Sequence, residues 1–203
     1  MNFQPQNFTG YVLAGGRSSR MGTDKSQLSI AGETFLHRAA RVLRPVCARV
    51  AIVLDRARET DAACEIVRDV YPERGALGGL HAALRSCRSE YALVLAVDLP
   101  LVSTGALIEL ASAAATAGAT HAAVVPRQVD GRLQPLCAVY RAAECLPTIE
   151  KLIAENTLSL RALLERVDHL IVDEAALGAG EQIFFNVNRP SDFAAVQEKL
   201  ERS

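Results

Sequence analysis

A regular alternation of two kinds of segment constrains the fold of this 203-residue chain more than any other feature of its sequence. Short apolar runs, such as residues 50–54 and 91–97, indicate strands that are buried on both faces. Longer segments, such as residues 34–46, repeat apolar residues at the spacing of an amphipathic helix. The alternation predicts an α/β fold, namely a three-layer, Rossmann-like, mostly parallel sheet with helices on both faces.

The remaining segments extend this pattern along the chain. Further strands are expected at residues 10–14, 66–67, 121–125, 136–140 and 170–172. Further helices are expected at residues 103–117, 144–153 and 159–165, around residues 80–84 and after Pro190. The glycine-containing segments 75–79 and 178–180 are interpreted as loops. Because 50% of the positions are hydrophobic, the chain can bury a core of ordinary size, and we expect a single domain spanning residues 1–203.

The composition argues against several classes of partner. The formal net charge of −1 provides no general attraction for nucleic acid or an anionic membrane. No segment approaches the ~20 apolar residues of a membrane span, and the N-terminus lacks the features of a secretory signal. The five cysteines form no C-x-x-C pair, which is typical of a reducing compartment. We therefore expect a cytoplasmic protein that binds neither nucleic acid nor membranes.

A glycine-rich loop with three cationic residues follows the first expected strand. Residues 13–25 read LAGGRSSRMGTDK and include Arg17, Arg20 and Lys25. Glycines let backbone N–H groups approach an anion closely, and the cationic side chains can neutralise a polyphosphate. The string fits neither the Walker A motif nor the dinucleotide-binding fingerprint. From these residues alone, an anion site and a solvated Gly-Gly turn both remain open.

The whole string resembles the signature loop of the molybdenum cofactor guanylyltransferases, within the wider superfamily of sugar and cofactor nucleotidyltransferases. The resemblance continues in order through Arg68-Asp69 and four later segments: GALGG at 75–79, VDLP at 97–100, PLCAVYR at 135–141 and NVNRP at 186–190. The form LAGG, in place of LAAG, points toward the guanylyl enzymes and away from the cytidylyl ones.

The resemblance implies roles for the first loop. Four consecutive residues would bind the nucleotide, the first three through backbone groups facing the base: Leu13, Ala14, Gly15 and Gly16. Lys25 would contact the nucleotide, and Arg20 would lie on its phosphates. With Asp98, these two cationic residues would form the catalytic set.

Asp98 follows the apolar run 91–97 and precedes Leu99-Pro100. Its carboxylate is therefore expected at the carboxyl edge of a buried strand, where open α/β sheets bind ligands. Mg²⁺ prefers oxygen ligands and is often held by one or two carboxylates together with substrate phosphates. A turn or helix cap before Pro100 is the alternative interpretation. The resemblance implies that Asp98 binds Mg²⁺ and contributes to nucleotide binding.

Three further polar residues are candidates for the site. Asp69 follows the expected strand 66–67 and could accept hydrogen bonds from base or ribose, as the resemblance implies, or be an ordinary loop residue. Asn186 and Asn188 share a face if the chain is extended, and the resemblance places this pair by the second substrate or the metal. Turn chemistry before Pro190 is the alternative for both. One departure from the family lies at Asp55-Arg56, where relatives often carry Asn, and it bears on base specificity.

The function implied by the resemblance is a Mg²⁺-dependent transfer of GMP from GTP to the terminal phosphate of molybdopterin or the molybdenum cofactor, with release of pyrophosphate. Transient contact with enzymes that make or receive this cofactor is also implied. Two alternatives remain: a nucleotidyltransferase of the same superfamily that uses CTP or a sugar 1-phosphate, and a catalytically silent nucleotide-binding module. The four histidines show no metal spacing and are expected to be hydrogen-bonded or exposed.

Overall fold

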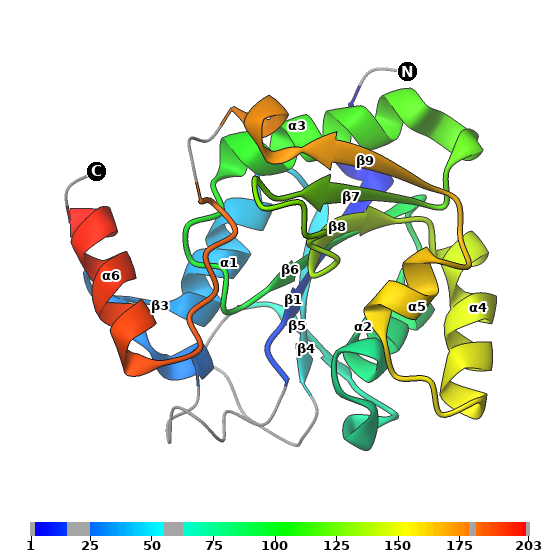
Figure 1. Ribbon diagram of the computed structural model, residues 1–203, viewed down its shortest axis with the longest axis horizontal. Helices are drawn as coiled ribbons and strands as arrows, with labels where there is room; N and C mark the ends of the chain where they lie inside the picture. The colour runs from blue at the N-terminus through cyan, green and yellow to red at the C-terminus, as the bar shows by residue number, and fades with distance from the viewer. Residues whose placement is uncertain (1–2, 16–24, 55–62, 179–181, 202–203) are drawn as a thin grey trace.

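The computed structural model describes residues 3–15, 25–54, 63–178 and 182–201 (Figure 1). Its main element is a seven-stranded sheet in the order β5-β4-β1-β6-β8-β7-β9. Four neighbouring strands on one side are mutually parallel: β5 (Glu65–Arg68), β4 (Arg49–Leu54), β1 (Phe8–Leu13) and β6 (Tyr91–Ala96). The alternating sequence pattern therefore predicts this half of the sheet correctly.

The other half of the sheet contains one reversed strand. β8 (Cys137–Tyr140) pairs antiparallel with both β6 and β7 (Ala123–Arg127), and β7 pairs parallel with β9 (His169–Asp173). The segment 128–136 between β7 and β8 is shorter than the dozen or so residues that a parallel crossover needs, so the two strands form a hairpin-like pair. The sheet as a whole is mostly parallel.

Helices cover both faces of the sheet, which gives three layers (Figure 1). One face packs against α1 (Phe35–Leu43) and α3 (Thr104–Ala117), and the other against α2 (Gly75–Ser86), α4 (Ala142–Ala154) and α5 (Leu160–Leu164). The side chains of β1 alternate between the faces, since Phe8 and Val12 join the first cluster, whereas Tyr11 and Leu13 join the second. This confirms the three-layer α/β prediction.

Local sequence features explain where three of the helices begin. Ser103 caps α3 by accepting a hydrogen bond from the Ala106 N–H at 3.2 Å, as its position before the alanine-rich segment predicts. Thr34 caps α1 by accepting from the His37 N–H at 3.2 Å. The last helix, α6 (Pro190–Glu201), begins at the expected proline. The described residues also contain five short 3₁₀ helices: Pro5–Asn7, Lys25–Gln27, Pro72–Arg74, Gly118–Thr120 and Glu174–Leu177.

One local prediction needs correction. Residues 75–79, interpreted as a loop, form the beginning of α2. Gly78 occurs there because a Cβ atom would lie only 2.5 Å from the carbonyl oxygen of Tyr71, so the glycine permits a close approach and does not mark a flexible loop. The sequence pattern also misses a small hairpin of β2 (Ser29–Ile30) and β3 (Glu33–Thr34), whose strands are too short to show a period. Residues 179 and 180 of the other expected loop, 178–180, lie outside the described residues.

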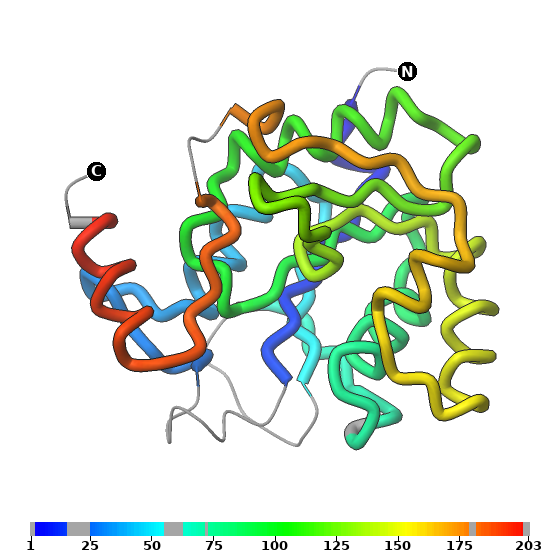
Figure 2. Tube along the Cα trace, viewed as in Figure 1, coloured from blue at the N-terminus to red at the C-terminus, as the bar shows by residue number. Residues whose placement is uncertain are grey.

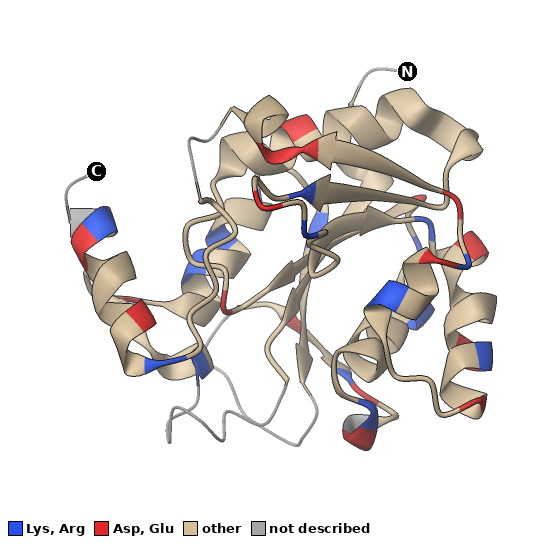
Figure 3. Cartoon of the chain, viewed as in Figure 1, with Lys and Arg blue, Asp and Glu red and all other residues tan. Residues whose placement is uncertain are grey.

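Within the described ranges, no helix combines the length and the apolar character needed to cross a membrane. In Figure 3 the positions of basic and acidic residues are interspersed along the elements that the structure describes.

Candidate active site

The loops that leave the parallel strands at their carboxyl ends are joined by backbone hydrogen bonds. The Ala14 N–H donates to the Val53 carbonyl at 3.0 Å, and the Val97 N–H donates to the Leu13 carbonyl at 3.1 Å. The Asp69 N–H donates to the Leu54 carbonyl at 3.0 Å. These bonds extend the sheet beyond its strands and bring Ala14, Asp69 and Asp98 to one edge, where ligands bind in open α/β sheets.

Three segments distant in sequence meet at one cationic group on this edge. The Lys25 Nζ donates to Asp98 Oδ2 at 3.1 Å and to Asn188 Oδ1 at 2.7 Å. The side chains of Lys25 and Asp98 are only 16% and 23% exposed, so solvent screens this ion pair less than a surface pair. Lys25, Asp98 and Asn188, named here the Lys25 cluster, are all residues that the sequence singled out.

The backbone around Asp98 positions its carboxylate. Asp98 lies in a turn directly after β6, as expected. The Asp98 carbonyl accepts a hydrogen bond from the Val187 N–H at 3.0 Å, which joins the turn to the C-terminal segment. Two residues further on, the Pro100 carbonyl accepts from Arg38 Nε at 2.7 Å. The turn is therefore held from both sides.

The C-terminal segment brings Asn188 to the site. Figure 2 shows this segment, coloured orange to red, alongside α1, and the rings of Phe193 and Phe35 lie 6.0 Å apart there. Asp192, in the first turn of α6, accepts hydrogen bonds from the Asn188 and Arg189 N–H groups at 2.9 Å and 2.8 Å through the same oxygen. Asn186 has a different environment, since its amide nitrogen lies 3.4 Å from the Phe184 carbonyl. Asn188 is thus the member of the pair that contacts Lys25.

Asp69 is placed by a turn against the beginning of α2. One of its carboxylate oxygens accepts from the Tyr71 N–H at 2.7 Å, which is a local turn contact. A Cβ at Gly78 would lie 2.9 Å and 3.2 Å from the two carboxylate oxygens, so α2 packs directly against this side chain. The carboxylate is half-buried at the same edge of the sheet as Asp98.

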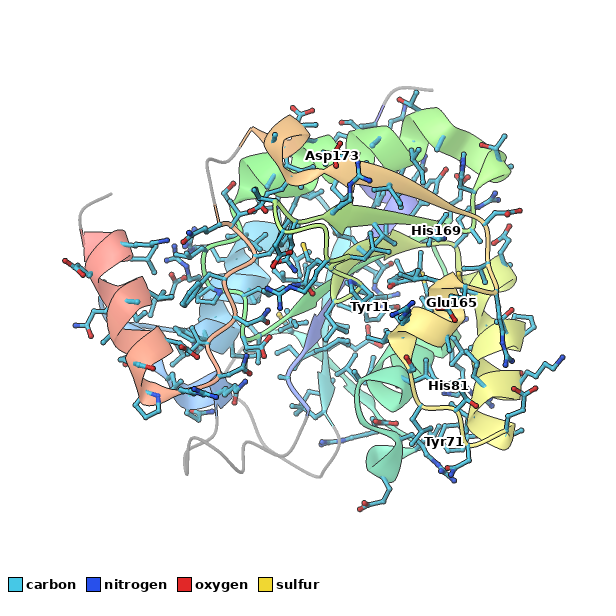
Figure 4. All side chains as sticks on the ribbon, viewed as in Figure 1. Tyr11, Tyr71, His81, Glu165, His169 and Asp173 are labelled. Carbon is cyan, nitrogen blue, oxygen red and sulfur yellow. The ribbon has the colours of Figure 1, made fainter. Side chains whose placement is uncertain are left out.

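His81, in α2, does not have the environment that the sequence analysis predicts for the histidines. The ring of Tyr71 packs edge-on against His81 with the ring centroids 4.9 Å apart (Figure 4). His81 is fully buried, and neither ring nitrogen has a hydrogen-bond partner among the described residues. Its Nε2 lies 3.6 Å from Glu150 Oε1, which is too long for a hydrogen bond. The prediction that the histidines are hydrogen-bonded or exposed is therefore wrong for His81, because packing against Tyr71 excludes water from its ring.

Several predicted residues can be placed only in part. Leu13 and Ala14 are buried at the end of β1, and Gly15 is exposed. Gly16 and Arg20 lie outside the described residues, as do Asp55 and Arg56. The predicted roles of Gly16 and Arg20 therefore stay predictions.

Arg38 is a residue that the sequence analysis missed. It lies three residues after Phe35 and four before Val42, on the buried face of α1, where a charged group needs a partner. That position in the helical pattern is the signal that could have identified it. Glu33 supplies the partner, with its Oε2 3.4 Å from Arg38 Nη1. Burial lowers the pKa of Arg38 from its usual value, and the pairing with Glu33 opposes this shift.

The cysteines offer no activated thiol in the core. Cys47, Cys137 and Cys145 are buried, and all five cysteines are free. Burial raises the pKa of each of these three thiols to about 12, so they stay protonated at neutral pH.

The two oxygens of the Lys25 cluster, from Asp98 and Asn188, are of the kind that binds a hard cation. A carboxylate oxygen of Asp98 and the amide oxygen of Asn188 already converge on the Lys25 ammonium group. Among the described residues, no group of three or more His, Cys, Asp or Glu side chains could hold a metal ion. A metal at this site would therefore rest on few protein ligands, which is the pattern that Mg²⁺ shows when substrate phosphates supply the others.

Comparisons with known proteins identify the family. Residues 10–170 match the model of the MobA-like NTP transferase domain. A probable molybdenum cofactor guanylyltransferase from Chloroflexus aggregans is 33% identical over 95% of this chain and 94% of its own length. One from Pelotomaculum thermopropionicum is 34% identical over 96% of this chain and 94% of its own length.

The structural comparison agrees on the fold. The crystal structure of molybdopterin-guanine dinucleotide biosynthesis protein A from Archaeoglobus fulgidus superimposes with a TM-score of 0.82. That match covers 96% of this chain and 100% of the other, at 23% identity, and so bears on the fold alone. The family model and the two relatives cover the first loop, Asp98 and most of the sheet. The chain belongs to the MobA-like NTP transferase family.

Proposed function

We propose that this chain transfers GMP from GTP to the terminal phosphate of molybdopterin or the molybdenum cofactor and releases pyrophosphate. The relatives named as probable molybdenum cofactor guanylyltransferases support the choice of substrates. The observation that carries the chemistry is the Lys25 cluster, where a cation, a carboxylate and an amide oxygen meet at the ligand-binding edge of the sheet. The product would pass to the enzymes that use this cofactor, through transient contacts.

The reaction that we propose needs no protein nucleophile. The terminal phosphate of the acceptor is ionised at neutral pH and can attack the α-phosphorus of the nucleotide directly. Catalysis then consists of holding two polyanions in line and neutralising the charge that grows on the leaving pyrophosphate. Lys25 contributes one positive charge, and Arg20 would contribute another. Bound Mg²⁺ would supply further positive charge at the phosphates.

The residues of the site divide between the two substrates in this proposal. The loop residues Leu13 to Gly16 and the carboxylate of Asp69 would bind the nucleotide. Asp98 would hold Mg²⁺, which suits a half-buried carboxylate in the turn after a buried strand. Asn188, anchored by Asp192, would lie between the metal and the acceptor, with Asn186 further along the same segment.

Substrate profiling tests the proposal. The purified protein is incubated with Mg²⁺, a molybdopterin-type acceptor and each of the four ribonucleoside triphosphates in turn, and pyrophosphate release is measured. We expect release with GTP alone. Release with CTP, or with a sugar 1-phosphate as acceptor, would point to another reaction of the superfamily. Nucleotide binding without any release would support a silent binding module.

A prediction concerns Arg38, which holds the turn after Asp98 through the Pro100 carbonyl. Replacing Arg38 with methionine removes this bond while filling much of the same space, so the turn and the Asp98 carboxylate become less well positioned. We expect transfer to fall about 10-fold, because small displacements of positioning groups carry costs of up to about 100-fold. Steady-state pyrophosphate release measures the effect.

Arg41→Met is the matched control for this prediction. Arg41 lies on the same helix and also pairs with Glu33, with its Nε 2.6 Å from Glu33 Oε1, but among the described residues it makes no hydrogen bond to the Asp98 turn. Its side chain is exposed, so we expect little change in turnover or stability. Equal losses in the two variants would show that the Glu33 pairing, and not the bond to Pro100, supports activity.

A further inference from the structure

We propose that Lys25 is a placeholder cation, which occupies the metal-binding oxygens of Asp98 and Asn188 until a nucleotide draws it away. Metal binding would then depend on nucleotide binding. This inference rests on the proposed function in that it takes Asp98 as the metal-binding carboxylate and the first loop as the phosphate-binding segment. It adds an order of binding that neither the fold nor the family membership implies.

The contacts of the Lys25 cluster support a placeholder. Lys25 Nζ lies 2.7 Å from Asn188 Oδ1 and 3.1 Å from Asp98 Oδ2, so one ammonium group takes both oxygen donors at once. The Asn188 amide presents its oxygen, not its nitrogen, to this group, which is also the orientation that a metal ligand requires. A hard divalent cation would seek the same two oxygens.

Charge makes the two cations competitors. Asp98 carries one negative charge, and the Lys25 ammonium group in contact with it already balances that charge. A divalent cation that approaches the same oxygens is repelled by the ammonium group, and the repulsion is strong because both side chains are largely shielded from water. The metal alone therefore meets a site with little net attraction.

A polyphosphate changes this balance. Its oxygens offer Lys25 several negative charges, so the ammonium group can leave Asp98 without losing an anionic partner. Asp98 and Asn188 are then open to the metal, and the phosphates add negative ligands of their own. By thermodynamic linkage, the factor by which nucleotide strengthens metal binding equals the factor by which the metal strengthens nucleotide binding. Lys25 is the group that carries this coupling.

Binding of Mn²⁺ alone, without nucleotide, tests the placeholder role. Free Mn²⁺ is measured by electron paramagnetic resonance in titrations of the wild type, Lys25→Met and Lys25→Arg. We expect Lys25→Met to bind Mn²⁺ about 10-fold more tightly than the wild type, within the ~5- to 150-fold range usual for coupled sites. Lys25→Arg keeps the charge and should stay within about 3-fold of the wild type on the same scale.

Two controls locate the effect. Lys151→Met removes the same charge from the exposed face of α4 and should leave Mn²⁺ binding unchanged. The double variant Lys25→Met with Asp98→Asn should lose the tighter binding, because the gain depends on the freed carboxylate. If Lys25→Met does not fold, as judged by circular dichroism, Lys25→Gln replaces it in the same titrations.

The result that would overturn the inference is equal Mn²⁺ affinity in the wild type and in the neutral variants at position 25. An equal gain in Lys151→Met, or a gain that survives Asp98→Asn, would overturn it as well. These titrations contain neither GTP nor acceptor, so their outcome is independent of substrate profiling. A protein that uses another nucleotide would fail the profiling and still show the tighter Mn²⁺ binding.

Discussion

Replacing Asp98 with asparagine is expected to abolish nucleotidyl transfer while leaving the fold intact. The substitution keeps the shape of the side chain and removes the one negative charge that contacts Lys25 in the described site. Loss of a fixed electrostatic group in an active site lowers turnover by about 10²- to 10³-fold. Because Asp98 is the proposed metal-binding carboxylate, we expect its loss to lower turnover by at least about 10³-fold. Pyrophosphate release under saturating substrate measures the loss.

The stability of Asp98→Asn should change little. Its ion pair with Lys25 is largely shielded from water, but the amide oxygen of asparagine can still accept a hydrogen bond from the Lys25 ammonium group, so the substitution is expected to cost about 1 kcal/mol of unfolding free energy. Asp130→Asn is the matched control, because it makes the same change of charge in an exposed turn where Asp130 pairs with Arg132. The control should keep wild-type turnover. Near-normal turnover in Asp98→Asn would remove the metal role from this carboxylate.

The elements that the sequence predicts well are those whose cause is local. The strands β4 and β6 are continuous apolar runs, and the helices α1 and α3 combine an apolar face with a capping Thr34 or Ser103. Each signal lies within the element that it predicts. The structure therefore confirms these elements, with boundaries that shift by a few residues.

The features that were missed depend on contacts between distant segments. Gly78 looks like a loop glycine in sequence, and only the packing of α2 against Tyr71 and Asp69 explains why a helix contains it. The direction of β8 is not visible in its own residues, although the short segment 128–136 before it was a usable signal. The apolar pattern of a segment predicts a strand but not whether that strand is parallel or antiparallel to its neighbours.

The candidate site shows the same division. The resemblance of the first loop and of the VDLP segment led to Lys25 and Asp98, and the rule for the carboxyl ends of strands placed both at one edge of the sheet. Their direct contact, and that of Lys25 with Asn188, joins residues 73 and 163 positions apart. Such pairing follows from the topology of the whole sheet, so the sequence supplied the members of the Lys25 cluster without their arrangement.

Gly78→Ala should destabilise the protein and weaken nucleotide binding together. A Cβ atom at this position would lie 2.5 Å from the Tyr71 carbonyl oxygen and 2.9 Å from Asp69 Oδ2, so the backbone of the Asp69 turn has to move. Overpacking of this kind costs about 1–3 kcal/mol of unfolding free energy, which exceeds the gain of up to ~1 kcal/mol expected for alanine in a helix. Because Asp69 moves with the turn, GTP affinity should also fall, by about 10-fold for each 1.4 kcal/mol of binding energy lost.

Gly79→Ala is the matched control on the next residue of the same helix. Its Cβ would lie 3.9 Å from Leu13 Cδ2, which is an ordinary van der Waals distance, so only the helix propensity changes. We expect this variant to be as stable as the wild type or more stable, with unchanged GTP affinity. Urea denaturation and calorimetry measure the two properties. Equal stability of the two alanine variants would refute the steric argument, and a destabilised Gly78→Ala that binds GTP normally would place Asp69 outside the nucleotide site.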